Sequence, residues 1–266
     1  MFSETKINSG LGVEGAEPND KIALVDADTI AYATCSVCEM GDDEVGYSIN
    51  LDFALSEAKV RIEDIRVATG CKDVELHFST GSTFRHKLTS SYKANRATTR
   101  YPEGLRDLKE MLVKEFEGKL HRDFEADDYV VWAKKHNSDK YVLCAVDKDV
   151  LNAVEGRHFN YYQSIKYNIP MKWIVTDAKK AIQFPFYQCL MGDSADGIQG
   201  IKGCGPKTAE KIIGEMVDEV ELWQEVVAQY KKAGMSEKEA LLTMRLVNMN
   251  QLSKDCTIDL WMAPGE

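Results

Sequence analysis

The chain of 266 residues lacks any run of 18 apolar residues, so the sequence predicts no membrane-spanning helix. Its first 20 residues are polar and contain no apolar stretch of the kind that a secretory signal needs, so we expect no export signal there. A Gly-X-Y repeat and a sustained heptad are also missing, which excludes collagen-like and long coiled-coil proteins. The composition, with 44% hydrophobic and 29% charged residues, is that of a globular protein with one large domain or two coupled ones.

Several common catalytic and metal-binding motifs are absent as well. Cys35 and Cys38 form a lone C-x-x-C, and the second pair that a zinc site requires is missing, so we interpret the seven cysteines as reduced thiols of a cytosolic protein. The five histidines show no metal-ligand spacing, and no G-x-S-x-G nucleophile motif occurs. A phosphate-binding P-loop is excluded because Pro206 stands where that motif requires lysine.

The net charge of −10, from 33 basic and 43 acidic residues, argues against a protein that simply coats nucleic acid. The charges are nevertheless segregated. Between Arg85 and Arg100 the chain carries five Lys or Arg residues and no acid, and a tyrosine that could stack on a base lies among them (Arg85, Lys87, Tyr92, Lys93, Arg96, Arg100). A solvated face explains this run equally well by itself, but the segregation suits a metal-dependent enzyme that acts on a polyanion.

Strand-like and helix-like segments alternate along the first two thirds of the chain. This alternation predicts an α/β fold with a parallel sheet, whose ligand site should lie at the carboxyl ends of the strands. The expected strands are 21–28, 74–80 and 141–150, with a pair of short strands in 157–175, and the expected helices are 51–69, 102–116 and 125–136.

Acidic residues gather at the ends of four of these elements. The groups are Asp26 with Asp28, Glu125 with Asp127 and Asp128, Asp147 with Asp149, and Asp193 with Asp196. Nine carboxylates could not converge without cations, because like charges at close range cannot all stay ionised. Magnesium or manganese prefers such ligands, and two ions about 4 Å apart can promote phosphodiester cleavage. A helix cap or a solvated acid explains any single pair more simply, and we interpret Asp28 as a cap of the following helix.

A glycine-rich segment, 197–213, predicts a helix-hairpin-helix turn. Gly203 and Gly205 would let the backbone approach a phosphate, and the amides that open the next helix would point toward it. Lys207 adds a positive charge, and Pro206 suits the first turn of that helix. A glycine-rich loop without a ligand is the simpler alternative.

Taken in order, LVDADTIAY, FRHKLTSSYKANR, EADDYVVWA, CAVDKDV and MGDSADGIQGIKGCGPKTAEKII resemble the flap endonuclease/5′→3′ exonuclease superfamily, and within it the exonucleases of T7-type bacteriophages. The resemblance covers residues 22–265. It implies a PIN-like α/β domain with a central, mostly parallel sheet and a helical helix-hairpin-helix region. The implied organisation is a flexible tail over 1–20, a nuclease domain over 21–183 with a basic arch near 85–104, a DNA-binding region over 184–236, and a C-terminal helix and strand over 237–266 that pack back on the nuclease domain.

The resemblance also implies roles for individual residues. Two Mg²⁺ or Mn²⁺ ions would be held by Asp26, Glu125, Asp127, Asp128, Asp147, Asp149, Asp193 and Asp196. Catalysis would involve Lys93, Arg96, Asp147 and Asp149. DNA would be contacted by Arg85, Tyr92, Lys93, Arg96, Arg100, Lys202, Gly203, Gly205, Lys207 and Thr208, with a K⁺ ion at the hairpin turn. The chain departs from the family at Thr80 and Gly81, where an aspartate is often found, so one metal contact would be missing or replaced by water.

The implied function is metal-dependent 5′→3′ exonuclease and flap endonuclease activity on double-stranded DNA. Removal of RNA primers from RNA–DNA hybrids is an alternative within the same family. A non-catalytic, structure-specific DNA-binding protein is a third, although the intact carboxylates argue against it. We expect a monomer in the cytoplasm, which would be that of a bacterial host if the chain is phage-encoded.

Overall fold

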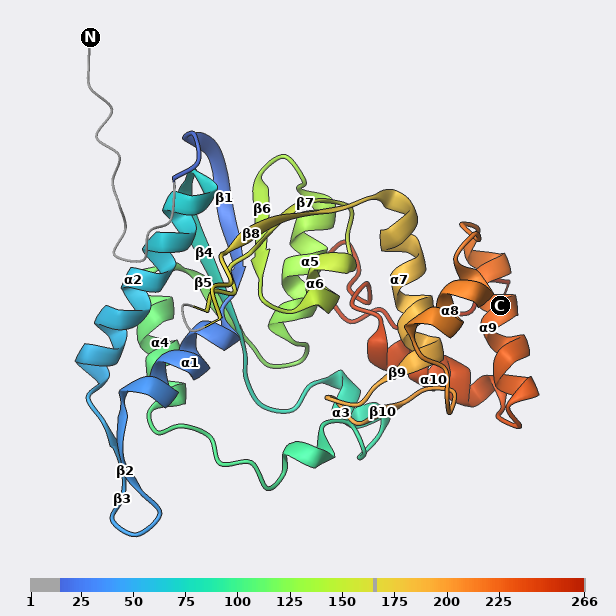
Figure 1. Cartoon of the computed structure of the whole chain (residues 1–266), viewed down its shortest axis with the longest axis horizontal. Helices are drawn as coiled ribbons and strands as arrows, with labels where there is room; N and C mark the ends of the chain where they lie inside the picture. Colours follow the sequence, from blue (N-terminus) through green and yellow to red (C-terminus); the bar gives the residue numbers. More distant parts are fainter. Residues whose placement is uncertain (1–14, 165–166, 266) are drawn as a thin grey trace.

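A six-stranded sheet forms the centre of the larger part of the molecule (Figure 1). The computed structural model describes residues 15–164 and 167–265. The strand order is β5-β4-β1-β6-β7-β8, and the last strand alone runs antiparallel to its neighbour. The strands are β1 (Asn19–Asp26), β4 (Cys71–Ser79), β5 (Glu117–His121), β6 (Tyr141–Ala145), β7 (Gly156–Asn160) and β8 (Lys172–Thr176). The predicted α/β class and the paired strands within 157–175 are confirmed.

Helices cover both faces of this sheet. Because alternate residues of a strand point to opposite faces, each central strand contributes side chains to both cores. On β1, Ala23 and Val25 belong to a core with residues of α1 (Asp28–Cys38), α2 (Leu51–Thr69) and α4 (Leu105–Glu115). Leu24, between them, belongs to a second core with residues of α5 (Ala126–His136) and α6 (Lys148–Asn152). The β1 strand is therefore apolar throughout its buried part, as the sequence indicated.

Helix α2 begins and ends where the sequence predicts. The side chain of Asn50 accepts a hydrogen bond from the Phe53 amide at 3.0 Å, which satisfies one of the free donors of the first turn. Gly70, with φ of 67°, ends the helix in the left-handed conformation that glycine adopts without strain.

Two segments project from or cross the carboxyl side of the sheet. A hairpin of β2 (Glu39–Asp42) and β3 (Gly46–Ile49) extends beyond α1 and α2, at the lower left of Figure 1. The predicted arch region joins β4 to α4 through the short helix α3 (Phe84–Leu88) and a single 3₁₀ turn (Ala94–Arg96), and it has no long helix of its own.

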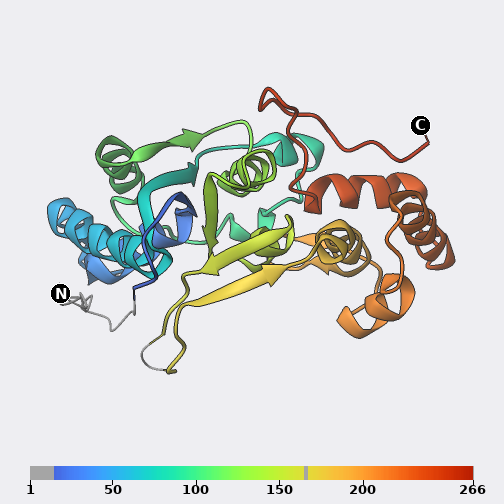
Figure 2. The same ribbon diagram turned by 90° about the horizontal axis from the view of Figure 1, so that it is seen from above.

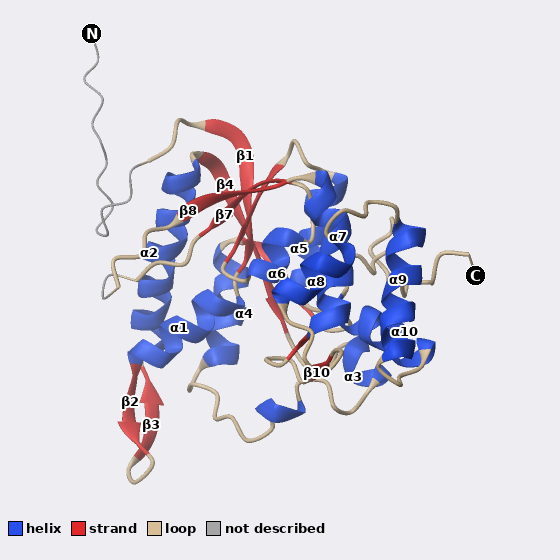
Figure 3. Cartoon of the chain, turned by 45° about the vertical axis from the view of Figure 1, so that its right-hand side comes forward, coloured by secondary structure: helices blue, strands red, loops and turns tan. Residues whose placement is uncertain are grey.

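The remaining helices form a separate region beside the sheet, as Figures 2 and 3 show. It comprises α7 (Ala178–Met191), the short pair β9 (Gly192–Asp193) and β10 (Ile198–Gln199), α8 (Pro206–Ile213), α9 (Glu219–Lys232) and α10 (Glu237–Val247). Its core is its own and includes Leu190, Ile213, Tyr230 and Met244, all fully or almost fully buried. Among the described residues, no helix is long and apolar enough to cross a bilayer.

The two ends of the chain differ from expectation. Residues 1–14 of the predicted tail lie outside the described residues, but the rest is fixed, because the Ala16 amide donates to the Val67 carbonyl and β1 begins at Asn19. The predicted C-terminal strand is wrong. The described part of 252–265 has a single bridge, between Leu252 and Ile258, in place of a sheet.

The C-terminal helix was also assigned to the wrong part. Helix α10 packs mainly with α7 and α9, in the core of the helical region. The segment after it contacts both parts, since the Trp132 indole donates to the Ser253 carbonyl at 2.8 Å while the ring of Trp261 lies 4.9 Å from that of Trp223. The remaining domain boundaries stay predictions.

Candidate active site

A cavity of about 1470 Å³ opens at the carboxyl ends of β1, β4 and β6. The start of α5, the loop 193–197 and the base of the arch complete its wall. Seven of the nine carboxylates that the sequence analysis singled out line it, namely Asp26, Asp28, Glu125, Asp127, Asp147, Asp193 and Asp196. Asp128 and Asp149 do not. The topology of a parallel sheet explains this convergence, because residues that follow its strands meet at one edge.

On the sheet side of the cavity, burial and neighbouring acids raise the pKa values of Asp26 and Asp127. Asp26 is 5% exposed, and burial, followed by the charge of Asp28, raises its pKa to about 8. Burial and then the charge of Asp26 raise the pKa of Asp127 well above its usual range. Asp149 does not line the cavity but follows Asp147, which does, and burial and then the charge of Asp147 raise its pKa to about 7. This side of the cavity therefore favours uptake of protons or of another cation.

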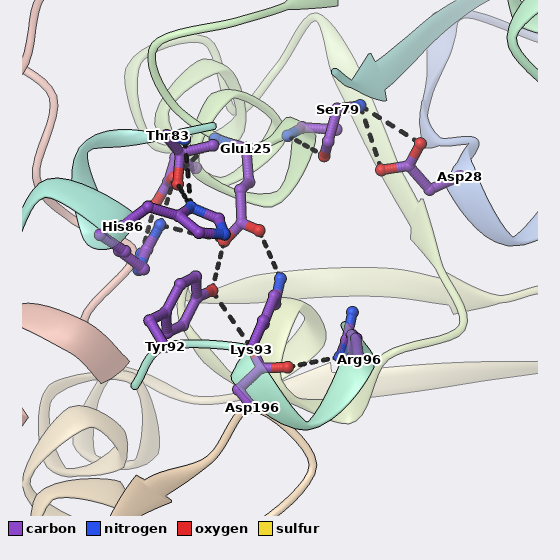
Figure 4. Close-up of polar contacts among 12 residues, drawn as sticks. Asp28, Ser79, Thr83, His86, Tyr92, Lys93, Arg96, Glu125 and Asp196 are labelled. Atoms are coloured by element: carbon purple, nitrogen blue, oxygen red, sulfur yellow. Dashed lines mark hydrogen bonds and ion pairs between the residues drawn. The ribbon is translucent and has the colours of Figure 1, made fainter. Parts of the chain in front are cut away.

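On the opposite side, the arch supplies its own cations (Figure 4). The Lys93 ammonium forms an ion pair with Glu125 and lies 3.5 Å from Asp196, while Arg96 pairs with Asp196. Burial alone would raise the pKa of Glu125, but Arg85 and Lys93 more than offset it and lower that pKa. The charge of Glu125 is thus balanced within the chain, whereas burial raises the pKa of Asp196 in spite of the neighbouring Lys93 and Arg96.

The loop that carries Lys93 is tied by its backbone to the loop 193–197. The Lys93 amide donates to the Asp196 carbonyl at 2.8 Å, and the Asn95 side chain donates to the Ala195 carbonyl at 3.1 Å. Lys93 has φ of 53°, a left-handed conformation that costs a non-glycine residue energy and is found mainly where the surroundings enforce it. A Cβ on Gly197 would lie 3.0 Å from the Ser91 carbonyl oxygen, so this close approach requires glycine.

Arg85 and Asp128 have a different role from the one that the resemblance implied. Arg85 is 2% exposed and Asp128 fully buried, and they form a two-fold hydrogen-bonded ion pair, with both N···O distances at 2.7 Å. Arg85 is therefore out of reach of DNA, and both oxygens of Asp128 are already used. The sequence could not show this pairing, because the partners are 43 residues apart.

Two of the predicted DNA contacts on the arch are engaged elsewhere. Tyr92 is 3% exposed, and its hydroxyl donates to Glu125 at 2.6 Å and also lies 3.2 Å from a carboxylate oxygen of Asp196, so its ring is not available to stack on a base. Arg100 pairs with Glu39 of the β2–β3 hairpin and lies over the ring of Tyr47 at 3.5 Å. Residues 85–100 contain no acid themselves, but their side chains form contacts with acids from other elements.

Asp28 is a cavity residue that the sequence analysis undervalued. It is the first residue of α1 and caps nothing with its side chain. Its carboxylate accepts from the Ser79 amide at 3.1 and 3.2 Å and from the Lys109 ammonium at 2.6 Å (Figure 4 shows the contact with Ser79). Asp28 therefore stands at the end of β4, close to Thr80 and Gly81, where the family often has an aspartate. Lys109 and Arg122, which also line the cavity, carried no local signal that marked them.

The donor set fits a hard divalent cation in its chemistry. It consists of carboxylates, several are buried, and the raised pKa values of Asp26 and Asp127 indicate negative charge that the chain leaves unbalanced. Within the described ranges, however, no three Asp, Glu, His or Cys side chains are arranged to hold one ion together. The assignment of two ions to the predicted carboxylates therefore stays a prediction. In this structure Lys93 pairs with Glu125 and Arg96 pairs with Asp196.

The predicted hairpin turn lies in the helical region. Gly203 has φ of 81°, and neither it nor Gly205 has an atom within 4 Å of the place where a Cβ would lie, so the backbone there is open to a ligand. Gly205 precedes α8 and Pro206 opens it. Lys202, Lys207 and Thr208 are exposed. The geometry agrees with a phosphate-binding turn.

Comparison with solved structures identifies the class to which this fold belongs. The flap endonuclease of bacteriophage T5 aligns with a TM-score of 0.63 and 18% identity over 86% of this chain and 89% of that chain. The catalytic core of Rad2 in complex with DNA aligns with a TM-score of 0.56 and 13% identity over 96% and 88%. The fold is that of the flap endonucleases and 5′-exonucleases, and the predicted PIN-like architecture is confirmed.

The relatives found by sequence are DNA polymerases I. DNA polymerase I of Thermus aquaticus is 29% identical over 208 residues, which are 75% of this chain and 24% of the polymerase. That of Lactococcus lactis is 26% identical over 268 residues, or 88% and 29%. The chain thus spans about a quarter of the length of the polymerases that it matches. No protein-family model matches it. The predicted fold is thus confirmed, while membership of the superfamily and the narrower resemblance to T7-type exonucleases stay predictions.

Proposed function

We propose that the protein is a divalent-metal-dependent 5′→3′ exonuclease and flap endonuclease that hydrolyses DNA phosphodiester bonds. One observation carries the proposal: seven carboxylates from separate elements line one cavity, whose opposite wall is the cationic base of the arch. The T5 flap endonuclease forms a complex with DNA and metal ions, and the T5 5′-exonuclease binds zinc, which supports the same chemistry here.

The sheet-side carboxylates are the proposed metal ligands. Asp26, Asp127, Asp147 and Asp193 face the cavity, and Glu125 and Asp196 would join them once Lys93 and Arg96 turn away. Asp149 lies next to Asp147 and would support it, since the Asp149 amide donates to Asp147 at 2.8 Å. Bound Mg²⁺ or Mn²⁺, as two ions, would supply an activated water and stabilise charge on the phosphate. Asp128 is not among the proposed ligands.

The cationic side chains of the arch would bind the substrate. Lys93 and Arg96 lie on the cavity wall and would donate hydrogen bonds to the non-bridging oxygens of the scissile phosphate, where negative charge grows during the reaction. Each would exchange a carboxylate partner for a phosphate partner, so the charge balance of the site is kept. No covalent intermediate is required.

The helical region would hold the duplex. The open backbone at Gly203 and Gly205, with Lys202, Lys207 and Thr208 beside it, would bind a phosphate of the DNA backbone. Backbone carbonyls of such a turn also suit K⁺, which we include in the proposal. These contacts carry no base specificity, so the enzyme would recognise the structure of the DNA end.

The test uses DNA labelled at the 5′ or the 3′ end, as blunt duplex, 5′ flap and 3′ flap, together with an RNA–DNA hybrid. With Mg²⁺ we expect short products from the 5′ label on the duplex and the released flap from the 5′-flap substrate, and no cleavage in EDTA. The hybrid shows whether RNA primers are substrates too. Cleavage that starts at 3′ ends, or duplex binding with no cleavage in either Mg²⁺ or Mn²⁺, would refute the proposal, and the second result would favour a non-catalytic DNA-binding protein.

A further inference from the structure

Every hydrogen-bond donor of the buried Arg85 guanidinium has a partner. Two donors reach the oxygens of Asp128 and a third reaches Glu125 Oε2 at 3.3 Å. The remaining two reach the carbonyls of Leu246, at 2.7 Å from Nε, and of Asn248, at 3.0 Å from Nη2. A guanidinium has five such donors, so this side chain is fixed from all sides.

The acids that Arg85 binds sit at the opening of α5. Glu125 immediately precedes that helix, and the Glu125 amide donates to Asp128 Oδ2 at 3.0 Å. Arg85 thus holds both the cavity-lining Glu125 and the residue that fixes its backbone. A lysine could not replace it, because an ammonium cannot form the paired, planar contacts with Asp128.

The two carboxylate oxygens of Glu125 have different partners. Oε2 accepts from Arg85 and from the Tyr92 hydroxyl, the latter at 2.6 Å, while Oε1 pairs with Lys93. Arg85 and Tyr92 therefore set the direction in which Oε1 points.

The opposite side of Arg85 is anchored to the end of α10. The carbonyls of the last helical turn have no partner within the helix, and they attract positive charge because the helix dipole ends there. The Leu246 and Asn248 carbonyls accept from Arg85, and Gln251 donates a further bond to Asn248 at 2.8 Å. Arg85 thus joins a rigid element of the helical region to the acid of the cavity.

We propose that Arg85 is a positioning residue that orients Glu125 for the reaction by clamping it between Asp128 and the end of α10. This inference rests on the proposed function. Arg85 touches neither DNA nor metal in this scheme. Arg85 affects the cleavage rate only through the position of Glu125. A residue that merely stabilises the fold would have no such dependence on Glu125.

The experiment measures single-turnover cleavage of the 5′-flap substrate at saturating enzyme and Mg²⁺, at a temperature where each variant is folded. Arg85→Lys should slow cleavage by about 10²-fold, the order of loss expected from a small misplacement of a reacting group. Duplex affinity in Ca²⁺ should change only slightly. Arg245→Lys is the matched control, because Arg245 lies on α10 and also donates to a backbone carbonyl, that of Trp261, away from the cavity.

A double-mutant cycle with Glu125→Gln gives the decisive reading. If Arg85 acts through Glu125, adding Arg85→Lys to Glu125→Gln slows cleavage no further. Penalties that multiply would overturn the proposal, as would an Arg85→Lys rate within about twofold of wild type, the scatter expected for independent sites. If Arg85→Lys does not fold, Asp128→Asn replaces it in the same cycle with the same expectation. A wild-type protein that cleaves none of the DNA substrates refutes the proposed function itself, and this inference falls with it.

Discussion

Two acids on the sheet side of the cavity, Asp26 and Asp127, and one on the arch side, Glu125, have pKa values shifted in opposite directions. On the sheet side, the pKa of Asp26 is raised to about 8 and that of Asp127 is also raised, because burial is not balanced by nearby cations. On the arch side, Lys93 and Arg85 hold the pKa of Glu125 below its usual range despite its burial. The difference indicates that the sheet side depends on cations from solution, whereas the arch side carries its own until substrate and metal arrive.

The largest effect is expected on the sheet side. Asp147→Asn should reduce single-turnover cleavage by about 10³-fold or more, because it removes a proposed metal ligand worth several kcal/mol in the transition state. The fold should survive, since Asp147 precedes α6 and asparagine caps a helix equally well. Duplex binding in Ca²⁺, measured by fluorescence anisotropy, should stay close to wild type. Wild-type turnover by this variant would remove Asp147 from the mechanism, and Asp139→Asn, at an exposed acid, is the control.

Lys93→Met tests the arch side. Cleavage should slow by about 10²-fold, the loss expected for removal of one donor to the developing charge. Mn²⁺ binding without DNA, measured by calorimetry, should become tighter, because the ammonium no longer competes for Glu125 and Asp196. Lys59→Met, which breaks a surface pair with Glu115, should alter neither quantity. Weaker Mn²⁺ binding by Lys93→Met would contradict the view that Lys93 occupies a metal position.

The hairpin turn should affect affinity without affecting chemistry. Lys207→Ala should weaken duplex binding and lower the slope of log K against log salt concentration by about 1, since one phosphate contact is lost. The cleavage rate at saturating DNA should stay unchanged. Lys232→Ala, at the exposed end of α9, is the control. An unchanged salt slope for Lys207→Ala would place the duplex elsewhere on the molecule.

The smallest predicted effect is on stability. Replacing Asp26 should raise the melting temperature, although it should lower the activity. The pKa of Asp26 in the folded protein lies above its unfolded value of 3.8, so Asp26 takes up a proton when the chain folds at neutral pH. The stability of the folded protein therefore falls as pH rises from about 4 to about 8. Asp26→Asn removes this penalty. In EDTA at pH 8 its Tm should exceed that of wild type by at least about 3 °C, and the difference should shrink toward pH 4.

The control for this stability prediction lies on the same strand. Asp20→Asn, at an exposed position of β1, should leave the Tm unchanged. Equal melting temperatures of Asp26→Asn and wild type at pH 8 would show that the sheet-side charge is already balanced.

Local patterns were sufficient for much of the fold. Helix 51–69 was predicted to the residue from its regular apolar spacing, and the structure shows Asn50 and Gly70 at its two ends. The convergence of Asp26 and Asp147 on one cavity followed from parallel-strand topology, whereas Asp193 and Asp196 reach it from the helical region. The C-terminal strand failed because a short apolar run, such as the one near Trp261, packs equally well as irregular chain against helices.

The errors in the site have a common physical cause. Arg85, Tyr92 and Arg100 were expected to face DNA because their own segment contains no acid, yet each meets an acid from another element. Such pairings depend on which distant residue lies opposite in the folded chain, and no local spacing encodes that. Asp128 was expected to bind metal for the same reason, since sequence alone does not distinguish it from Asp127.

The central claim is that the sheet-side carboxylates bind divalent ions for phosphodiester cleavage. The most direct measurement is the anomalous scattering of crystals of the protein soaked in Mn²⁺. We predict Mn²⁺ peaks within coordination distance, about 2.2 Å, of Asp26, Asp127 or Asp147 oxygens, with Lys93 turned away from Glu125. Full Mn²⁺ saturation of the crystal with no peak at these residues, and with Lys93 still paired to Glu125, would contradict the account.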